Sequence, residues 1–333
     1  MPGAQERVLR RRIGSIQNTK KITRAMELIA ATRVVKAQMA ANDARPYSEQ
    51  ITTVIANLAA GGTAVSHPLL REAGDVRKVG IVVLTSDRGL AGAYNSTVIR
   101  SAERVIVAAK AEGKDYSLIT IGKKAEGYFK FRNYTIDAAF TGISDKPTYE
   151  DARAVAAKVT ELFNDDVDVI ELAYTRFVSM GTQEAVVRRF LPLETAAPAA
   201  DAPATTGPSA EFEFEPSPAS VLESLLPRYV ESRLFAALLD AAASEHANRQ
   251  RAMKAATDNA QELIIKLQRK MNQARQDAIT TEIMEIVGGA EALRQSQSDT
   301  SDLLVDQVNV EDIFNPNHVL AARTAHFSSE EQS

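Results

Sequence analysis

The sequence contains no cysteine and no tryptophan, and only 6% of its residues are aromatic. The lack of cysteine excludes disulfide bonds and any metal or redox chemistry based on thiolates. Enzymes with deep ligand pockets usually line them with more aromatic side chains than this. Only four histidines are present, and none pairs with another at a metal-ligand spacing. The composition therefore gives little support for an enzyme or a metalloprotein.

Long apolar runs are also lacking. The longest lies around Val79–Leu84, far short of the ~20 apolar residues that cross a bilayer. Basic residues begin at Arg7, but no apolar segment of a signal peptide follows them. The net charge of −4 gives no whole-chain case for nucleic-acid binding. We expect a soluble protein whose role at a membrane, if it has one, passes through partners.

The first part of the chain, residues 4–56, has the pattern of a long helix. No glycine or proline lies between Gly14 and Arg45. We expect Pro46 to bend the helix without stopping it, and the pair at residues 61–62 to end it. The larger apolar residues that recur near helical spacing are Ile13, Ile16, Met26 and Ile29.

Residues 77–193 alternate between strand and helix patterns, which predicts an α/β layer with right-handed crossovers. Helices are expected at 94–112, Lys123–Lys130 and Thr148–Asn164. The expected strands are Val79–Thr85, Tyr116–Gly122, a strand near Thr135–Phe140, Val169–Val178 and Glu184–Leu193. Residues 195–220 are rich in Ala, Pro, Thr and Ser. The first half of this segment predicts a disordered loop, whereas the second half, Phe212–Pro218, has two aromatic residues and could dock on another surface.

A second and longer helix is predicted over residues 219–293. It contains no proline between Pro227 and Pro316. At 1.5 Å per residue it would measure on the order of 110 Å, too long for the core of its own domain. Its narrow apolar seam, not a strict heptad, consists of Ala256, Ala260, Leu263, Leu267, Met271, Ala274 and Ala278. We therefore predict that the two terminal helices pair as an antiparallel coiled coil around the inserted α/β domain.

Two segments could carry chemistry. Ser86–Asn95 (SDRGLAGAYN) follows a strand and precedes a helix, where anions often bind. It lacks both the GxGxxG and the GxxxxGK[ST] motifs, so we interpret it as a tight turn. Asp165, Asp166 and Asp168 lie between a helix and a strand and predict a solvated turn. No GxSxG motif occurs, so serine-hydrolase chemistry has no support.

The N-terminal helix is strongly basic. Ten basic against three acidic residues give residues 1–45 a net charge of +7. A basic shaft facing acidic protein surfaces fits this pattern. A coiled-coil scaffold or nucleic-acid-binding protein is the alternative, although no aromatic residue interleaves the charges. A nucleotide-binding α/β enzyme built on Val79–Asn95 is a third interpretation.

Several motifs resemble one family. RRRIGSIQNTKKITRAMELIAATRVVKAQ (Arg10–Gln38) is similar to the N-terminal signature of gamma subunits of bacterial F-type ATP synthases. SDRGLAGAYN resembles the strand-turn-helix segment of that family. Further motifs match in order: FEPSP (Phe214–Pro218), LLPRYVESRLF (Leu225–Phe235), SEHANRQRAMKAATDNAQELI (Ser244–Ile264) and NQARQDAITTEIMEIVGGAEAL (Asn272–Leu293). The resemblance covers about residues 4–293.

The resemblance implies a fold and a function. It implies a shaft helix over residues 1–60, a Rossmann-like α/β domain over 75–194, a flexible loop over 195–218, a second shaft helix over 219–293, and a polar tail over 294–333. The chain would be the non-catalytic, cofactor-free rotor of a proton-translocating synthase. It would turn inside a head of three alpha and three beta subunits. Its foot would rest with epsilon on the ring of c subunits, at the cytoplasmic face of the plasma membrane.

The resemblance also implies roles for particular residues. Met26 would lie near the acidic lever loop of a beta subunit. Arg275, Gln276 and Thr280 would contact the beta subunits. The apolar tip in the bearing of the head would consist of Ile283, Ile286 and Val287, and the foot residues near the c ring would be Phe214 and Glu215. Two departures from the family pattern are the expanded loop at 195–210 and the 40 residues of the tail.

Overall fold

The structure is a computed structural model that describes residues 4–60, 67–71, 74–193 and 217–298. The chain divides into a larger unit, Arg11–Leu267, and a smaller unit formed by Met1–Arg10 and Gln268–Ser333. Two long helices, α1 (Ala4–Ala60) and α5 (Pro218–Ser298), contribute to both units. Among the helices that the structure describes, none carries an apolar stretch long enough to span a lipid bilayer.

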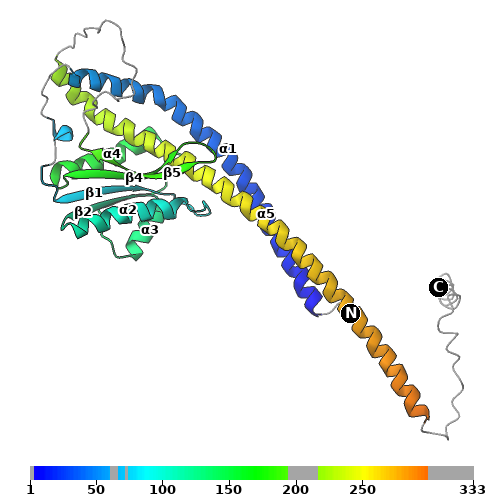
Figure 1. The fold of residues 1–333 in the computed structure, drawn as a ribbon. Coiled ribbons are helices and arrows are strands. Elements are labelled where there is room, and N and C mark those ends of the chain that lie inside the picture. Colours follow the sequence, from blue (N-terminus) through cyan, green and yellow to red (C-terminus); the bar gives the residue numbers. More distant parts are fainter. Residues whose placement is uncertain (1–3, 61–66, 72–73, 194–216, 299–333) are drawn as a thin grey trace, which may run out of the picture. The chain divides into compact units, whose positions relative to one another are not determined.

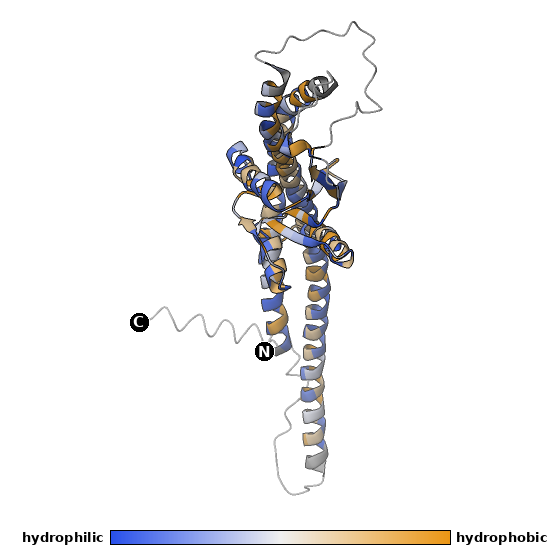
Figure 2. Ribbon diagram, turned by 90° about the vertical axis from the view of Figure 1, so that its left-hand side faces the viewer, coloured by the Kyte–Doolittle hydropathy of each residue, from blue (hydrophilic) through white to orange (hydrophobic). Residues whose placement is uncertain are grey.

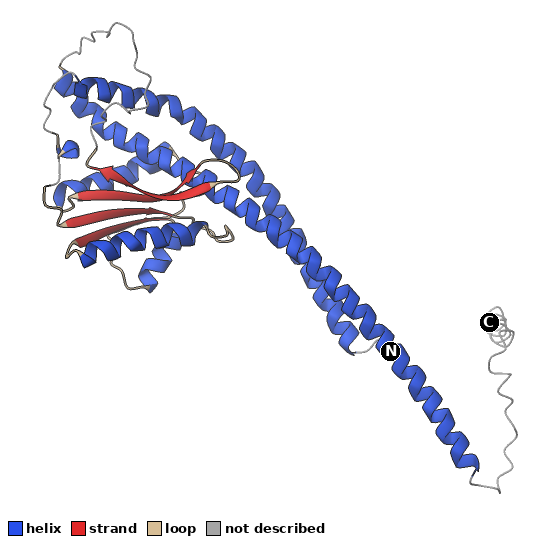
Figure 3. Ribbon diagram, in the orientation of Figure 1, coloured by secondary structure: helices blue, strands red, loops and turns tan. Residues whose placement is uncertain are grey.

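The centre of the larger unit is a five-stranded sheet (Figures 1 and 3). Its strands are β1 (Lys78–Leu84), β2 (Asp115–Ile121), β3 (Ala138–Phe140), β4 (Val169–Phe177) and β5 (Gln183–Leu191). The spatial order is β3-β2-β1-β4-β5, and only β5 runs antiparallel to its neighbour. Six of the seven β1 residues are buried, because this central strand is covered on both faces.

Helices cover both faces of the sheet. Alternate β1 side chains enter two apolar cores, since successive residues of a strand point to opposite sides. Ile81 and Val83 pack with α2 (Tyr94–Ala111) and α3 (Lys123–Phe131). Val82 and Leu84 share the other core with α4 (Tyr149–Asp165), the short 3₁₀ helix η1 (Pro68–Leu70), and parts of α1 and α5. The α/β layer therefore shares one core with the C-terminal part of α1 (Ile51 and Ile55) and the N-terminal part of α5 (Leu222 to Ala241).

Within the larger unit, α1 and α5 lie side by side and run antiparallel (Figures 1 and 2). The Thr23 hydroxyl lies 2.8 Å from that of Thr257, and Lys20 Nζ donates to Gln261 Oε1 at 2.6 Å. Moving back along α1 thus moves forward along α5, which is the register of an antiparallel pair. The predicted coiled coil with an inserted Rossmann-like α/β domain is confirmed.

The seam between the two helices differs in detail from the prediction. The buried α5 positions are Met253, Thr257, Ala260, Ile264 and Leu267, which step regularly by four and three residues. Leu263, which the sequence placed in the seam, is 40% exposed. The buried α1 positions are Ile13, Thr23, Glu27, Ala30 and Val34, whereas Ile29 is largely exposed. The seam is therefore a regular heptad, hidden from the sequence because polar Thr23, Glu27 and Thr257 occupy core positions.

The other elements lie close to their predicted bounds. Thr148 caps α4 through a capping box with Asp151. Strand β3 is shorter than expected because the Asp137 carboxylate binds Ser117 and the Leu118 amide just before it begins. Pro46 lies inside α1 without ending it. Helix α5 passes through the glycine pair at residues 288–289 and continues beyond Leu293 to Ser298.

Candidate functional site

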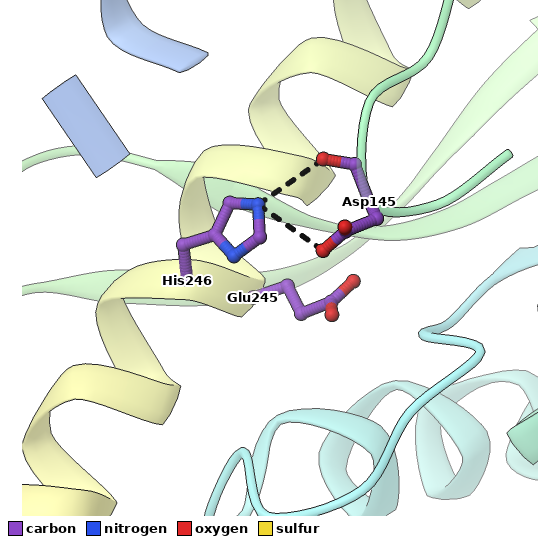
Figure 4. A group of neighbouring side chains, drawn as sticks. All are labelled: Asp145, Glu245 and His246. Atoms are coloured by element: carbon purple, nitrogen blue, oxygen red, sulfur yellow. Dashed lines mark hydrogen bonds and ion pairs between the residues drawn. The ribbon is translucent and has the colours of Figure 1, made fainter. Parts of the chain in front are cut away.

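A cluster of ionisable side chains joins α1, α5 and the α/β layer. Asp145 lies in the loop between β3 and α4, and Glu245 and His246 are neighbours on α5 (Figure 4). One ligand atom of each of these three residues lies within 4.8 Å of those of the other two. Together with Arg33 of α1 and Arg249 of α5, they form what we call the ionic junction.

Two guanidinium groups neutralise the two carboxylates of the ionic junction. Arg249 Nη2 donates to Glu245 Oε1 at 2.6 Å, across one turn of α5, with only 8% and 1% of these side chains exposed. Arg33 Nη1 donates to both carboxylate oxygens of Asp145. Such charge-assisted contacts are stronger than neutral hydrogen bonds. The second contact therefore ties α1 to the α/β layer.

The neighbours of His246 define its tautomer. Its Nε2 lies 3.1 Å from the main-chain oxygen of Asp145, so this nitrogen carries the proton and donates. Its Nδ1 lies 3.3 Å from Arg249 Nη1 and accepts from it. Burial lowers the pKa of His246, because a charged imidazolium would be desolvated beside Arg249. The ring is therefore a neutral bridge between α5 and the α/β layer.

Glu245 is the most deeply buried acid of the ionic junction. Burial raises the pKa of its carboxyl group, against the opposing attraction of Arg249. Its Oε2 atom has no hydrogen-bond partner within the described part of the chain. Arg249 Nη2 also lies 3.4 Å from the main-chain oxygen of Gly89, in the turn between β1 and α2. Arg249 is thus the residue that links Glu245 to the sheet.

The ionic junction does not fit a metal ion. A divalent cation bound there would have to displace Arg33 from Asp145, and it would still lie beside the buried guanidinium of Arg249. The two carboxylates already have cationic partners, and the imidazole nitrogen Nδ1 accepts from one of them. The arrangement fits a mechanical role instead, since it fixes both long helices to the α/β layer.

The Asp87 carboxylate, in the turn at Ser86–Asn95, binds main-chain amides of neighbouring segments. Asp87 accepts hydrogen bonds from the amides of Gly142, Ser144 and Lys123. Burial alone would raise the pKa of Asp87, but these hydrogen bonds outweigh it and lower the pKa. The side chain of Asn95 accepts from the Ser86 amide at 2.9 Å. The turn is thus closed by its own side chains, as its interpretation as a packing turn requires.

The acidic turn after α4 also binds main-chain groups. Asp168 accepts from the amides of Arg77 at 2.7 Å and Lys78 at 3.0 Å, and these contacts lower its pKa. Asp166 forms an ion pair with the Lys78 ammonium. The interpretation as a turn, and not as a cation site, is supported by these contacts.

The site residues implied by the resemblance fall in different parts of the chain. Met26 belongs to the larger unit, where it is partly buried and lines a cavity of about 380 Å³ together with Arg33 and Arg249. Six others lie on the part of α5 that belongs to the smaller unit, and all are exposed: Arg275, Gln276, Thr280, Ile283, Ile286 and Val287. Phe214 and Glu215 lie outside the described residues.

The part of α5 that belongs to the smaller unit carries several exposed apolar side chains. Ile283, Ile286 and Val287 are 55%, 72% and 59% exposed. A helix with large apolar residues exposed around it usually needs a partner surface. Thr280 Oγ1 donates to the main-chain oxygen of Gln276 at 3.0 Å, so this hydroxyl is bonded within its own helix.

Sequence reasoning missed the ionic junction. The one local signal was the spacing of Glu245 and Arg249, which matches an i,i+4 ion pair on a helix. Asp145 and Arg33 are separated from α5 and from each other by long stretches of chain. Their meeting depends on the fold, so no spacing rule could have identified it.

Comparisons with known proteins agree with this fold. The sequence matches the family described as ATP synthase over residues 5–293. It is 51% identical to the ATP synthase gamma chain of Frankia casuarinae over 297 residues, which covers 87% of this chain and 98% of the relative. It is 50% identical to that of a Parafrankia species over 294 residues, with coverage of 87% and 98%.

A solved structure is similar in fold. A chain in the cryo-EM structure of the Euglena gracilis mitochondrial ATP synthase, in the assembly of OSCP, F1 and c-ring, superposes with a TM-score of 0.59. The sequence identity is 16%, and the match covers 91% of this chain and 98% of that one. Residues 294–333 lie beyond the family match. The length and identity of these matches show that the chain belongs to the ATP synthase gamma-chain family.

Proposed function

We propose that this chain is the rotor of the central stalk in a bacterial proton-translocating ATP synthase. It would couple rotation of the c ring to conformational change in the catalytic beta subunits, without being catalytic itself. Its closest partners would be the alpha and beta subunits of the head, the epsilon subunit and the c ring. It would reach the cytoplasmic face of the plasma membrane only through that ring, and it would not bind nucleic acid.

The observation that carries this proposal is the antiparallel pairing of α1 with α5. Its regular seam provides a stiff element, and the exposed surface of α1 carries basic side chains such as Arg11, Lys21 and Arg24. A rotor must transmit torque between partners at its two ends without bending at the joint. The ionic junction supports this requirement, because it crosslinks α1, α5 and the α/β layer by charged groups.

The roles of individual residues follow from the same proposal. Met26 would face the acidic lever loop of a beta subunit. The exposed polar residues Arg275, Gln276 and Thr280 would contact beta subunits higher on the shaft. The apolar side chains of Ile283, Ile286 and Val287 would turn in the bearing of the head, where their exposed surface would be covered.

The proposed division of labour follows the sequence segments. Residues 1–60 and 219–293 would form the shaft, and 75–194 the α/β domain at its foot. The loop at 195–218, with Phe214 and Glu215, would approach the c ring. The tail at 294–333 would lie outside the shaft that the family shares, and removing it tests whether it changes the ATPase rate of the assembled enzyme.

The test of the proposal is Met26→Lys in the reconstituted synthase. The new lysine would place a positive charge beside the acidic lever loop of the beta subunit. We therefore expect ATP-driven proton pumping to fall while the fold is kept. The matched control is Met39→Lys, which adds the same charge to a methionine that is 60% exposed on the same helix. Unchanged pumping by Met26→Lys, or an equal loss in both variants, would count against the assignment of Met26.

A further inference from the structure

A cavity of about 330 Å³ lies beside Asp145 and His246 of the ionic junction. It is bounded by α1, by the loop at residues 145–147 and by α5. The lining residues that matter here are Arg33, Lys36, Ala37, Lys146, Leu239 and Ala242. Its volume is within the range of small-molecule sites, near the lower end. Nothing in the proposed rotor function uses it.

The floor of this cavity consists of apolar side chains. Leu239 and Ala242 of α5 are buried, with 3% and 2% of their surface exposed, and Ala37 of α1 lies opposite. The floor can therefore accept the apolar body of a ligand but offers it no hydrogen bonds.

The rim of this cavity is cationic. Lys36 and Lys146 are exposed, and within the described residues neither ammonium forms an ion pair or hydrogen bond. The one acid in the lining, Asp145, is already bound by Arg33, and His246 is a neutral donor to its main chain. Three cations against one carboxylate leave the rim with an excess positive charge.

We propose that this cavity binds a small amphipathic organic anion, with a carboxylate, sulfonate or phosphate-ester head on an apolar body. The head lies between Lys36 and Lys146, and the body lies over Leu239 and Ala242. Because Arg33 lines the cavity and also holds Asp145, a bound anion competes for that guanidinium. Occupancy of the cavity is therefore coupled to the ionic junction.

The experiment titrates the full chain with octanoate, with octanol as the uncharged ligand of equal chain length, and with inorganic phosphate. Binding is located by hydrogen exchange. We expect octanoate to protect residues 33–40 and 145–147, and to bind at least about 10-fold more tightly than octanol or phosphate, since it alone has both parts.

Matched variants separate this site from other surfaces. Each lysine contributes about 3-fold to affinity, as exposed charge pairs usually do, so Lys36→Gln with Lys146→Gln lowers octanoate affinity about 10-fold. The control pair, Lys21→Gln with Lys254→Gln, removes one exposed lysine from α1 and one from α5, both outside the cavity lining, and leaves affinity unchanged. Ala37→Leu fills the floor and abolishes binding. Equal loss in the control pair, no loss in the cavity pair, or protection confined to residues 279–293 overturns the proposal.

Discussion

Removing Arg249 should destabilise the larger unit more than any other single change in the ionic junction. Glu245 is 1% exposed, and among the described residues Arg249 is its one charged hydrogen-bond partner, at 2.6 Å. Breaking a buried ion pair on one side costs about 3–5 kcal/mol, because an uncompensated charge remains. We expect Arg249→Ala to lower the free energy of unfolding by this amount at pH 8.

The loss should depend on pH with a definite sign. Burial already raises the pKa of Glu245 with Arg249 present, and without the guanidinium nothing opposes that shift. A carboxyl group whose pKa is raised in the folded state lowers the free energy of unfolding as pH rises through that pKa. Below its unfolded pKa of about 4.5 this loss of stability is absent. The destabilisation by Arg249→Ala should therefore shrink steadily between pH 8 and pH 5.

The assay is urea unfolding followed by circular dichroism, with hydrogen exchange of the α5 amides around residue 245 to confirm that the change is local. The control is the double variant Glu245→Gln with Arg249→Met. It removes both charges, and it should cost only about 1–2 kcal/mol, since neutral side chains replace the pair. If the double variant were as unstable as Arg249→Ala, or the loss were independent of pH, the electrostatic explanation would be wrong.

Two further predictions concern other parts of the larger unit. Burial raises the pKa of Asp240 to about 6, so Asp240→Asn should raise stability by roughly 1–2 kcal/mol at pH 8 and have little effect near pH 4, as measured by urea midpoints at both pH values. A change in stability of equal size at the two pH values would contradict this prediction. Gly122 has a φ of +93°, and an added Cβ would lie 2.2 Å from the Thr85 main-chain oxygen. Gly122→Ala should therefore cost more than about 2 kcal/mol, whereas Gly127→Ala, with no atom near the added carbon, should not destabilise α3.

Local patterns predicted most of the fold. The apolar run of β1 predicts a buried strand, and the long stretches without glycine or proline, 15–45 in α1 and 228–287 in α5, predict two long helices. All three elements were placed correctly. The seam was misassigned where a polar residue occupies it: Thr257 contacts Thr23 across the pair, whereas the prediction placed its neighbour Ala256 in the seam. The prediction also placed Leu263 there in place of the buried Ile264. Hydrophobic spacing alone cannot detect a buried pair of hydroxyl groups.

The functional residues were less accessible to sequence reasoning. Ile283, Ile286 and Val287 are exposed, and that a partner covers them is implied by the family resemblance alone. The ionic junction brings Arg33 and Asp145 to α5 from distant parts of the chain. Such a contact depends on tertiary structure, so it became visible only when the elements were assembled.

The central claim is that this chain rotates as a rigid shaft. The direct measurement is single-molecule rotation after reconstitution with the alpha and beta subunits of the same synthase, with a bead attached through a cysteine introduced at Phe131, which is 84% exposed on α3. Because the chain has no cysteine of its own, the introduced thiol is the one such attachment point on this chain. The account predicts stepwise, unidirectional rotation of the bead on addition of ATP. A complex that assembles and hydrolyses ATP while the bead stays still would contradict it.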